Sequence, residues 1–160
     1  MPDTSTEVAI ATTTLGANGT ISFTSIPATY TDLRLVLTCT TVTGGGSAFK
    51  YNNDSSSLYS QTWLIGDGSS ATSVRATVQP ELGLSTANIS ATVPAFFTID
   101  IFNYAGSTFK TSLTTASQDL NGSGQLERQV GLYRSTTAIS SIAFTTSFKT
   151  GATATLYGIL

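Results

Sequence analysis

Hydrophobic and polar positions alternate with a period of two along almost the whole chain. In segment 32–41 every second position is apolar, and these positions carry Leu33, Leu35, Leu37 and Cys39. Such alternation predicts half-buried β-strands, whereas the helical period of 3.6 residues is almost absent. Similar segments recur along the chain and are separated by turns rich in Gly, Asn and Asp. We therefore expect a protein built of β-strands.

The expected strands lie at 8–15, 20–26, 32–41, 47–51, 58–65, 71–79, 95–103, 108–115, 125–133, 139–147 and 152–159. Asn18-Gly19 predicts a tight hairpin between the first two strands, because Asn and Gly tolerate positive φ. Segment 71–79 precedes Pro80 and is expected at a sheet edge. Segment 95–103 is the most apolar and is expected at the centre. Segment 81–92 is the least periodic stretch and the one place where a helical turn is tolerable.

So many strands cannot form one flat sheet with a dry core, so two packed sheets or a closed barrel are required. Connections of variable length favour an all-β, antiparallel Greek-key or jelly-roll β-sandwich of about eight to ten strands. Residues 1–15 are expected to form an extended N-terminal arm or first strand, and residues 16–160 a single sandwich domain.

The composition excludes several classes of function. The 160 residues include 7 Lys or Arg, 9 Asp or Glu, one Cys and no His, with a net charge of −2. Without histidine there is no Ser-His-Asp or Cys-His catalysis and no His metal ligand. The scattered cations argue against nucleic-acid binding, and no apolar run is long enough for a membrane span. No signal peptide is visible at the N-terminus, and Cys39 is expected to be a buried thiol.

The carboxylates do not form a recognisable catalytic pair. Asp100 lies on the face of its strand opposite Ile99 and Ile101, and a partnership with Asp67 or Glu127 is the one acid–base arrangement to weigh. The oxygen-rich loops at 52–54 and 66–68 are interpreted as turns rather than metal sites. We expect no enzyme activity and no cofactor.

Four aromatic residues are candidates for contact with a partner or a glycan: Tyr51, Tyr59, Trp63 and Tyr104. Aromatic rings on a sandwich face can stack on sugars, and neighbouring Asn and Asp side chains can bind sugar hydroxyls. Packing in the core or between subunits is the alternative interpretation.

Several segments in order resemble a group of small virion proteins of tailed bacteriophages, common in phages of cyanobacteria and other aquatic bacteria. These segments are FTSIPATYTDLRLV (23–36), YNNDSSSLYS (51–60), IDIFNY (99–104) with Lys110-Thr111, GLYRSTTAI (131–139) and ATLYGI (154–159). The resemblance covers residues 20–160, and it brings no catalytic motif.

This resemblance implies a non-enzymatic structural protein of the virion, and first of all a capsid decoration (cement) protein. Such proteins are usually β-sandwiches that assemble as homotrimers. The implied partner is the major capsid protein, and the implied location is the outer capsid surface. A tail or fibre component with host-glycan recognition is the alternative. An extended N-terminal arm could add a strand to a neighbouring subunit.

Overall fold

The computed structural model describes residues 6–86 and 88–160 of the chain. All the secondary-structure elements assigned within these residues are β-strands. The strands are β1 (Glu7–Thr14), β2 (Ser22–Phe23), β3 (Asp32–Cys39), β4 (Ala48–Tyr51), β5 (Tyr59–Gly66), β6 (Ala71–Gln79), β7 (Leu82–Gly83), β8 (Ala95–Phe102), β9 (Lys110–Asp119), β10 (Gly124–Tyr133), β11 (Ile142–Phe144) and β12 (Thr153–Ile159). The tolerated helical turn at 81–92 is therefore absent from the part of that segment that the structure describes, and β7 lies there instead.

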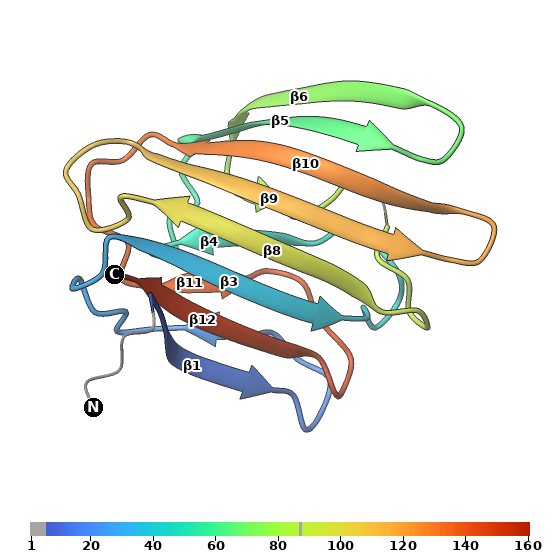
Figure 1. Cartoon of the computed structure of the whole chain (residues 1–160), viewed down its shortest axis with the longest axis horizontal. Helices are drawn as coiled ribbons and strands as arrows, with labels where there is room; N and C mark the ends of the chain where they lie inside the picture. The colour runs from blue at the N-terminus through green and yellow to red at the C-terminus, as the bar shows by residue number, and fades with distance from the viewer. Residues whose placement is uncertain (1–5, 87) are drawn as a thin grey trace.

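The strands form two antiparallel sheets of unequal size. The large sheet has eight strands in the order β1-β12-β3-β8-β9-β10-β5-β6, and the small sheet has four in the order β2-β11-β4-β7. The large sheet lies in front in Figure 1, and the small sheet lies behind it. The predicted all-β, antiparallel sandwich is thereby confirmed. The strand number exceeds the expected eight to ten, in part because β2 and β7 are only two residues long.

The predicted alternation sets the orientation of the large sheet. In β3 the positions Leu33, Leu35, Leu37 and Cys39 are buried, and the positions between them are more exposed. β8 has the same pattern and lies between β3 and β9, as the fourth of the eight strands counted from β1. The predictions of a buried Cys39 and a central segment 95–103 are both confirmed. We call the buried side of this sheet its inner face and the opposite side its outer face.

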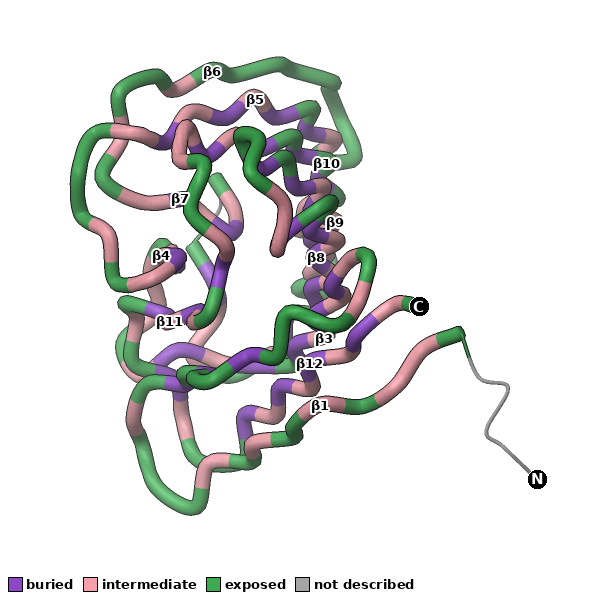
Figure 2. The backbone as a smooth tube through the Cα atoms, turned by 90° about the vertical axis from the view of Figure 1, so that its left-hand side faces the viewer, coloured by how far each residue is buried: buried purple, intermediate pink, exposed green. Residues whose placement is uncertain are grey.

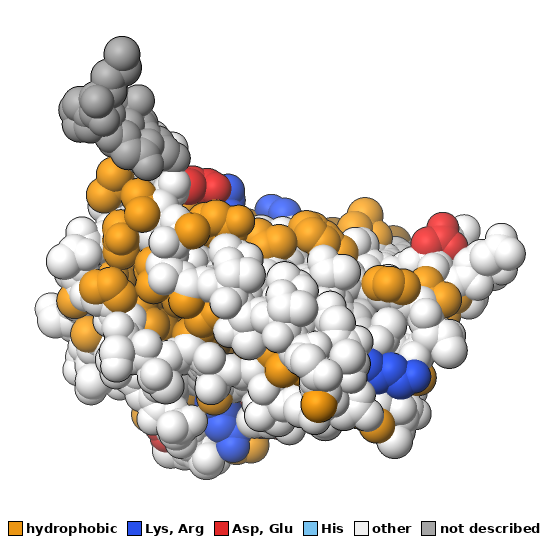
Figure 3. Space-filling model, turned by 90° about the horizontal axis from the view of Figure 1, so that it is seen from below, with side chains coloured by type: hydrophobic (Ala, Val, Ile, Leu, Met, Phe, Trp, Pro, Cys, Tyr) orange, Lys and Arg blue, Asp and Glu red, His pale blue; other side chains and the backbone are white. Residues whose placement is uncertain are grey.

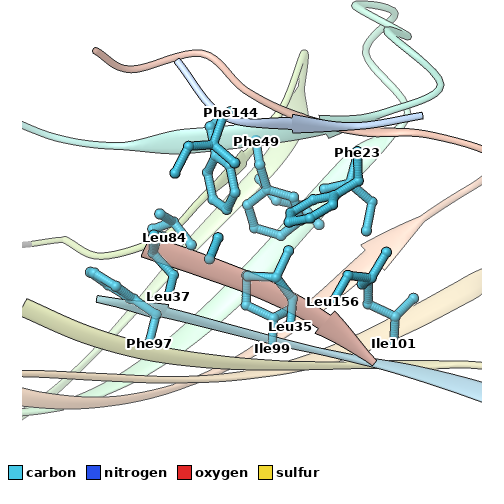
Figure 4. Close-up of a cluster of buried hydrophobic side chains, with 14 of the residues drawn as sticks. Phe23, Leu35, Leu37, Phe49, Leu84, Phe97, Ile99, Ile101, Phe144 and Leu156 are labelled. Atoms are coloured by element: carbon cyan, nitrogen blue, oxygen red, sulfur yellow. The ribbon is translucent and has the colours of Figure 1, made fainter. Parts of the chain in front are cut away.

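The hydrophobic core lies between the two sheets. Phe23, Phe49 and Phe144 from the small sheet point toward the large sheet, which contributes Leu35, Leu37, Ile99 and Leu156 among others (Figure 4). All of these side chains are buried. Burial of each such side chain contributes roughly 1.5–3 kcal/mol, so this layer is the main source of stability.

The predicted hairpin between segments 8–15 and 20–26 is wrong. β1 pairs with β12, from Glu7↔Ile159 to Thr14↔Thr153, whereas β2 pairs with β11 in the other sheet. The chain thus crosses from one sheet to the other at Asn18-Gly19 instead of turning back. Residues 1–5 of the expected arm lie outside the described residues.

The second Asn-Gly pair does form a hairpin. Asn121 and Gly122 have φ values of 58° and 116°, and the Leu120 amide donates a 2.8 Å hydrogen bond to the Ser123 carbonyl. This two-residue turn joins β9 to β10, which are neighbours in the large sheet.

β6 forms one edge of the large sheet, as predicted for segment 71–79. Most of its residues are exposed, and the strand is green along most of its length in Figure 2. Within the described residues, no helix has the length and apolarity required to cross a membrane.

Candidate interaction surface

The four aromatic candidates lie in the interior. Tyr51, Tyr59, Trp63 and Tyr104 are all buried. Stacking on a sugar requires an accessible ring face, so the proposal that these residues contact a glycan is corrected. The core-packing interpretation is the one that the structure supports.

Two of these aromatic residues pack together with Tyr133. The rings of Tyr59 and Tyr133 are stacked with centroids 4.7 Å apart, and Tyr51 lies 5.5 Å from Tyr133. The Tyr133 hydroxyl donates a 2.7 Å hydrogen bond to Asp54 Oδ2. Burial raises the pKa of Tyr51 and of Tyr59 well above their usual range. These phenols therefore stay protonated, and the cluster fastens the loop after β4 to the large sheet.

Trp63 and Tyr104 lie in other parts of the interior. The Tyr104 hydroxyl donates to the Pro27 carbonyl and holds the segment before β3. Trp63 lies on the inner face of β5, and the position of a Cβ on Gly83 would be 3.3 Å from its ring. The structure brings Tyr51 and Tyr59 together but joins neither of the other two to them.

The three carboxylates considered for acid–base chemistry lie in different environments. Asp100 is on the outer face and accepts a 2.6 Å hydrogen bond from Arg34 Nε. Glu127 is buried on the inner face and accepts hydrogen bonds from the Ser85 hydroxyl at 2.8 Å and the Thr86 amide at 3.0 Å. Asp67 accepts hydrogen bonds from Ser69 and Ser70 in the β5–β6 turn. No cleft brings these three groups together in the described part of the chain.

The oxygen-rich loops are turns. Asp54 Oδ1 accepts the Ser56 amide at 2.8 Å, and the hydroxyl and amide of Ser56 are the main reason why the Asp54 pKa is lowered. The four hydrogen bonds from Ser69 and Ser70 likewise lower the pKa of Asp67. Within residues 6–86 and 88–160, no three Cys, Asp or Glu side chains gather closely enough to hold a metal ion.

Cys39 is a buried thiol at the end of β3, where it is opposite Ala95 of β8. Burial raises its pKa to about 12, so the reactive thiolate is absent near neutral pH. The side chain acts as a small apolar group in the core.

The outer face of the large sheet carries apolar side chains that solvent reaches. Leu64 and Leu126 are 60% and 59% exposed, Val130 is 48% exposed, and Phe96 and Phe102 are 44% and 42% exposed. Leu64 on β5 and Leu126 and Val130 on β10 surround Arg128, which pairs in register with Leu64. We call Leu64, Leu126 and Val130 the apolar patch.

Arg128 extends this surface toward β9, because its guanidinium donates a 2.6 Å hydrogen bond to Thr115 Oγ1. At the other end of the outer face, Arg34 bridges Asp100 and Glu7. The hydrogen bond that Arg34 donates to Asp100 is the largest reason why the pKa of Arg34 is raised. Figure 3 shows the molecule from below, from the side of β1 and not onto the outer face, and charged groups are few on that side.

The apolar patch was not among the candidates from sequence. The available signal was the parity of the strands: in segment 125–133, Leu126 and Val130 alternate with Glu127 and Gln129. Two apolar and two polar side chains on opposite faces left the buried face ambiguous. The structure buries Glu127 and Gln129 and exposes Leu126 and Val130.

Comparison with known proteins gives no match: no family model fits this chain, and no curated protein or solved structure is significantly similar to it. The resemblance to phage virion proteins therefore stays a prediction.

Proposed function

We propose that this chain is a non-enzymatic structural protein of a bacteriophage virion, and specifically a capsid decoration (cement) protein. In this role it binds the shell of the major capsid protein on its outer surface. Binding to the assembled shell alone would stabilise that state by mass action. The protein's own chemistry is then limited to recognition and packing.

The observation that carries the proposal is the exposed apolar side chains on the outer face. Exposed apolar side chains that gather at one place on a surface can mark an interaction site. The apolar patch is centred on Arg128, a residue type that is enriched at energetic centres of interfaces.

Self-association as a homotrimer is part of the same proposal. A closed ring of three copies uses one heterologous contact repeated by symmetry. Its mass can be measured directly by analytical ultracentrifugation of the purified chain. A monomer at all concentrations would remove the trimer from the proposal while leaving shell binding open to test.

The shell-binding test compares two variants in the same assay. Leu64→Ser with Leu126→Ser replaces two exposed apolar side chains of the patch, and Phe109→Ser makes the same type of change in the β8–β9 connection, where Phe109 is also exposed. Purified capsids without the protein are incubated with each variant, and occupancy is measured by sedimentation. Loss of binding in the patch variant alone supports the proposal. Equal binding by all variants rules out the patch as the contact.

Deletion of residues 1–15 is a poorer test of attachment, because it also removes β1 from the large sheet. Labelled antibodies in electron microscopy separate the two virion locations. Label on heads is expected, whereas label on tails alone would replace capsid decoration with the tail or fibre alternative.

A further inference from the structure

The chain contains two Asn-Gly pairs, Asn18-Gly19 and Asn121-Gly122. An Asn-Gly pair can deamidate without an enzyme. The backbone nitrogen of the glycine attacks the side-chain carbonyl carbon of the asparagine, ammonia leaves, and a cyclic imide forms. Water then opens the ring to give aspartate or isoaspartate. Glycine favours the reaction because it has no side chain to hinder the approach of the backbone.

The structure holds both reacting groups of the first pair in place. Asn18 Oδ1 accepts a 3.1 Å hydrogen bond from the Thr150 amide and a longer one from the Thr150 hydroxyl. The attacking nitrogen of Gly19 donates a 3.0 Å hydrogen bond to the Phe148 carbonyl, and the Phe148 amide donates to Gly19 in return. Imide formation at Asn18 requires that these bonds break.

The second pair lacks such restraints. Asn121 and Gly122 are exposed at the tip of the β9–β10 hairpin. The Asn121 backbone amide donates to Asp119 Oδ1, but within the described residues no hydrogen bond holds the Asn121 side chain or the Gly122 nitrogen. A Cβ would meet nothing within 4 Å at either Gly19 or Gly122, so the two pairs differ in their hydrogen bonds and not in the space around the glycine.

We propose that Asn121 is a site of spontaneous deamidation in the folded protein and that Asn18 is protected. Modification replaces a neutral amide with a carboxylate and so adds one negative charge to a chain whose net charge is −2. The new charge falls beside a groove that Asp67, Asp119, Gly122 and the exposed ring of Phe96 line together. Isoaspartate also lengthens the backbone of this two-residue turn. This inference depends on the fold alone and not on the proposed virion role.

The test follows both sites in the same sample. The purified full chain is incubated in mildly alkaline buffer, and peptides containing each site are measured over time by mass spectrometry with separation of aspartate from isoaspartate. We expect Asn121 to react at least about tenfold faster than Asn18, a factor equivalent to about 1.4 kcal/mol of local protection. Equal rates in the folded protein, or faster reaction at Asn18, would overturn the proposal.

Two controls assign the difference to the structure. In concentrated urea the protecting bonds of Asn18 are lost, so both sites should react at similar rates. Persistence of the difference in urea would contradict the structural explanation. Asn121→Gln should abolish the mass change in the hairpin peptide and leave the Asn18 peptide unchanged, and a mass change that persists in that peptide would place the reaction at another residue.

Discussion

The two halves of the inner face of the large sheet are both buried but differ in composition. The half formed by β12, β3 and β8 is aliphatic and aromatic, with Leu156, Leu35, Leu37, Phe97 and Ile99. The half formed by β9, β10 and β5 is mixed: beside Tyr59, Trp63, Ile65 and Tyr133 it buries the polar side chains of Lys110, Ser112, Thr114, Glu127, Gln129 and Gln61, and we call it the polar half. The first half supports the fold through apolar area alone, whereas the second adds directed hydrogen bonds.

The polar half holds the segment that crosses over it between β7 and β8. Gln61 Oε1 accepts the Gly83 amide at 2.9 Å, Glu127 binds Ser85 and Thr86, and Gln118 donates to the Val93 carbonyl at 2.9 Å. Little of this segment pairs as a strand, so these side chains provide the partners that its backbone needs. Buried polar side chains here provide the hydrogen bonds that a neighbouring strand would otherwise provide.

The polar half also carries a cost that the apolar half does not. Thr114 Oγ1, Gln129 Oε1 and Trp63 Nε1 are buried without a hydrogen-bond partner among the described residues. These residues occupy adjacent positions on β9, β10 and β5. A buried polar group without a partner costs roughly 1–3 kcal/mol, so removing one of these unpartnered groups should stabilise the protein.

The largest effect is expected in the apolar half. Leu35→Ala removes a fully buried side chain between the two sheets and should lower the free energy of unfolding by about 2–5 kcal/mol. Urea denaturation measures the loss. Val36→Ala, one residue along on the outer face, is the matched control and should cost much less. Equal losses would mean that the inner face does not carry the apolar stabilisation.

The next effect is expected at Glu127. Glu127→Leu leaves the Thr86 amide and the Ser85 hydroxyl without their acceptor and should destabilise the protein by about 1–3 kcal/mol. Glu127→Gln keeps one acceptor oxygen and should cost less. Limited proteolysis should also cut the leucine variant faster within the segment after β7. If leucine is tolerated as well as glutamine, the carboxylate does not anchor this segment.

A gain in stability is expected at Thr114. Thr114→Val replaces an unpartnered buried hydroxyl with a methyl group of similar size and should stabilise the protein by up to about 1 kcal/mol. Thr41 is equally buried, but its hydroxyl donates a 2.8 Å hydrogen bond to the Ile89 carbonyl. Thr41→Val should therefore destabilise by about 1 kcal/mol. Thermal unfolding of both variants gives the sign of each change, and the same sign in both would refute the distinction.

The smallest effect is expected at Asp54, in the loop after β4, which accepts a hydrogen bond from Tyr133 at the end of β10. Hydrogen bonds from Ser56 and then Tyr133 lower the pKa of this carboxyl in the folded protein. Its contribution is therefore present above the unfolded pKa of about 3.9 and is lost as the pH falls below that value. Solvent screening limits the effect to under about 1 kcal/mol. Asp54→Asn should reduce the loss of stability in acid, measured by urea denaturation between neutral and acidic pH, whereas an unchanged acid response would assign that response to other carboxyls.

The apolar half could be predicted from the sequence because its alternation is unbroken, as in Leu33, Leu35 and Leu37. The polar half could not, because Gln61 between Tyr59 and Trp63 suggests an accessible face. The structure buries Gln61 because Gly83, distant in sequence, supplies its partner. A contact between distant segments also explains why one Asn-Gly pair forms a hairpin and the other does not. The Asn18 side chain accepts a hydrogen bond from the Thr150 amide, which lies far along the chain. The exposure of Leu64 and Leu126 was missed because it too depends on contacts between segments that are distant in the sequence.

The pairing of β1 with β12 has a consequence for synthesis of the protein. Glu7 is opposite Ile159 in the finished sheet, so β1 leaves the ribosome long before the strand that receives it exists. Contacts between such distant segments close slowly, because a long loop must be ordered first. During that interval β1 lacks its partner strand β12. The same is true of β1 in every other chain that is being synthesised nearby. Synthesis rate and temperature should therefore influence the yield of correctly folded protein more strongly than the stability of the finished fold would suggest.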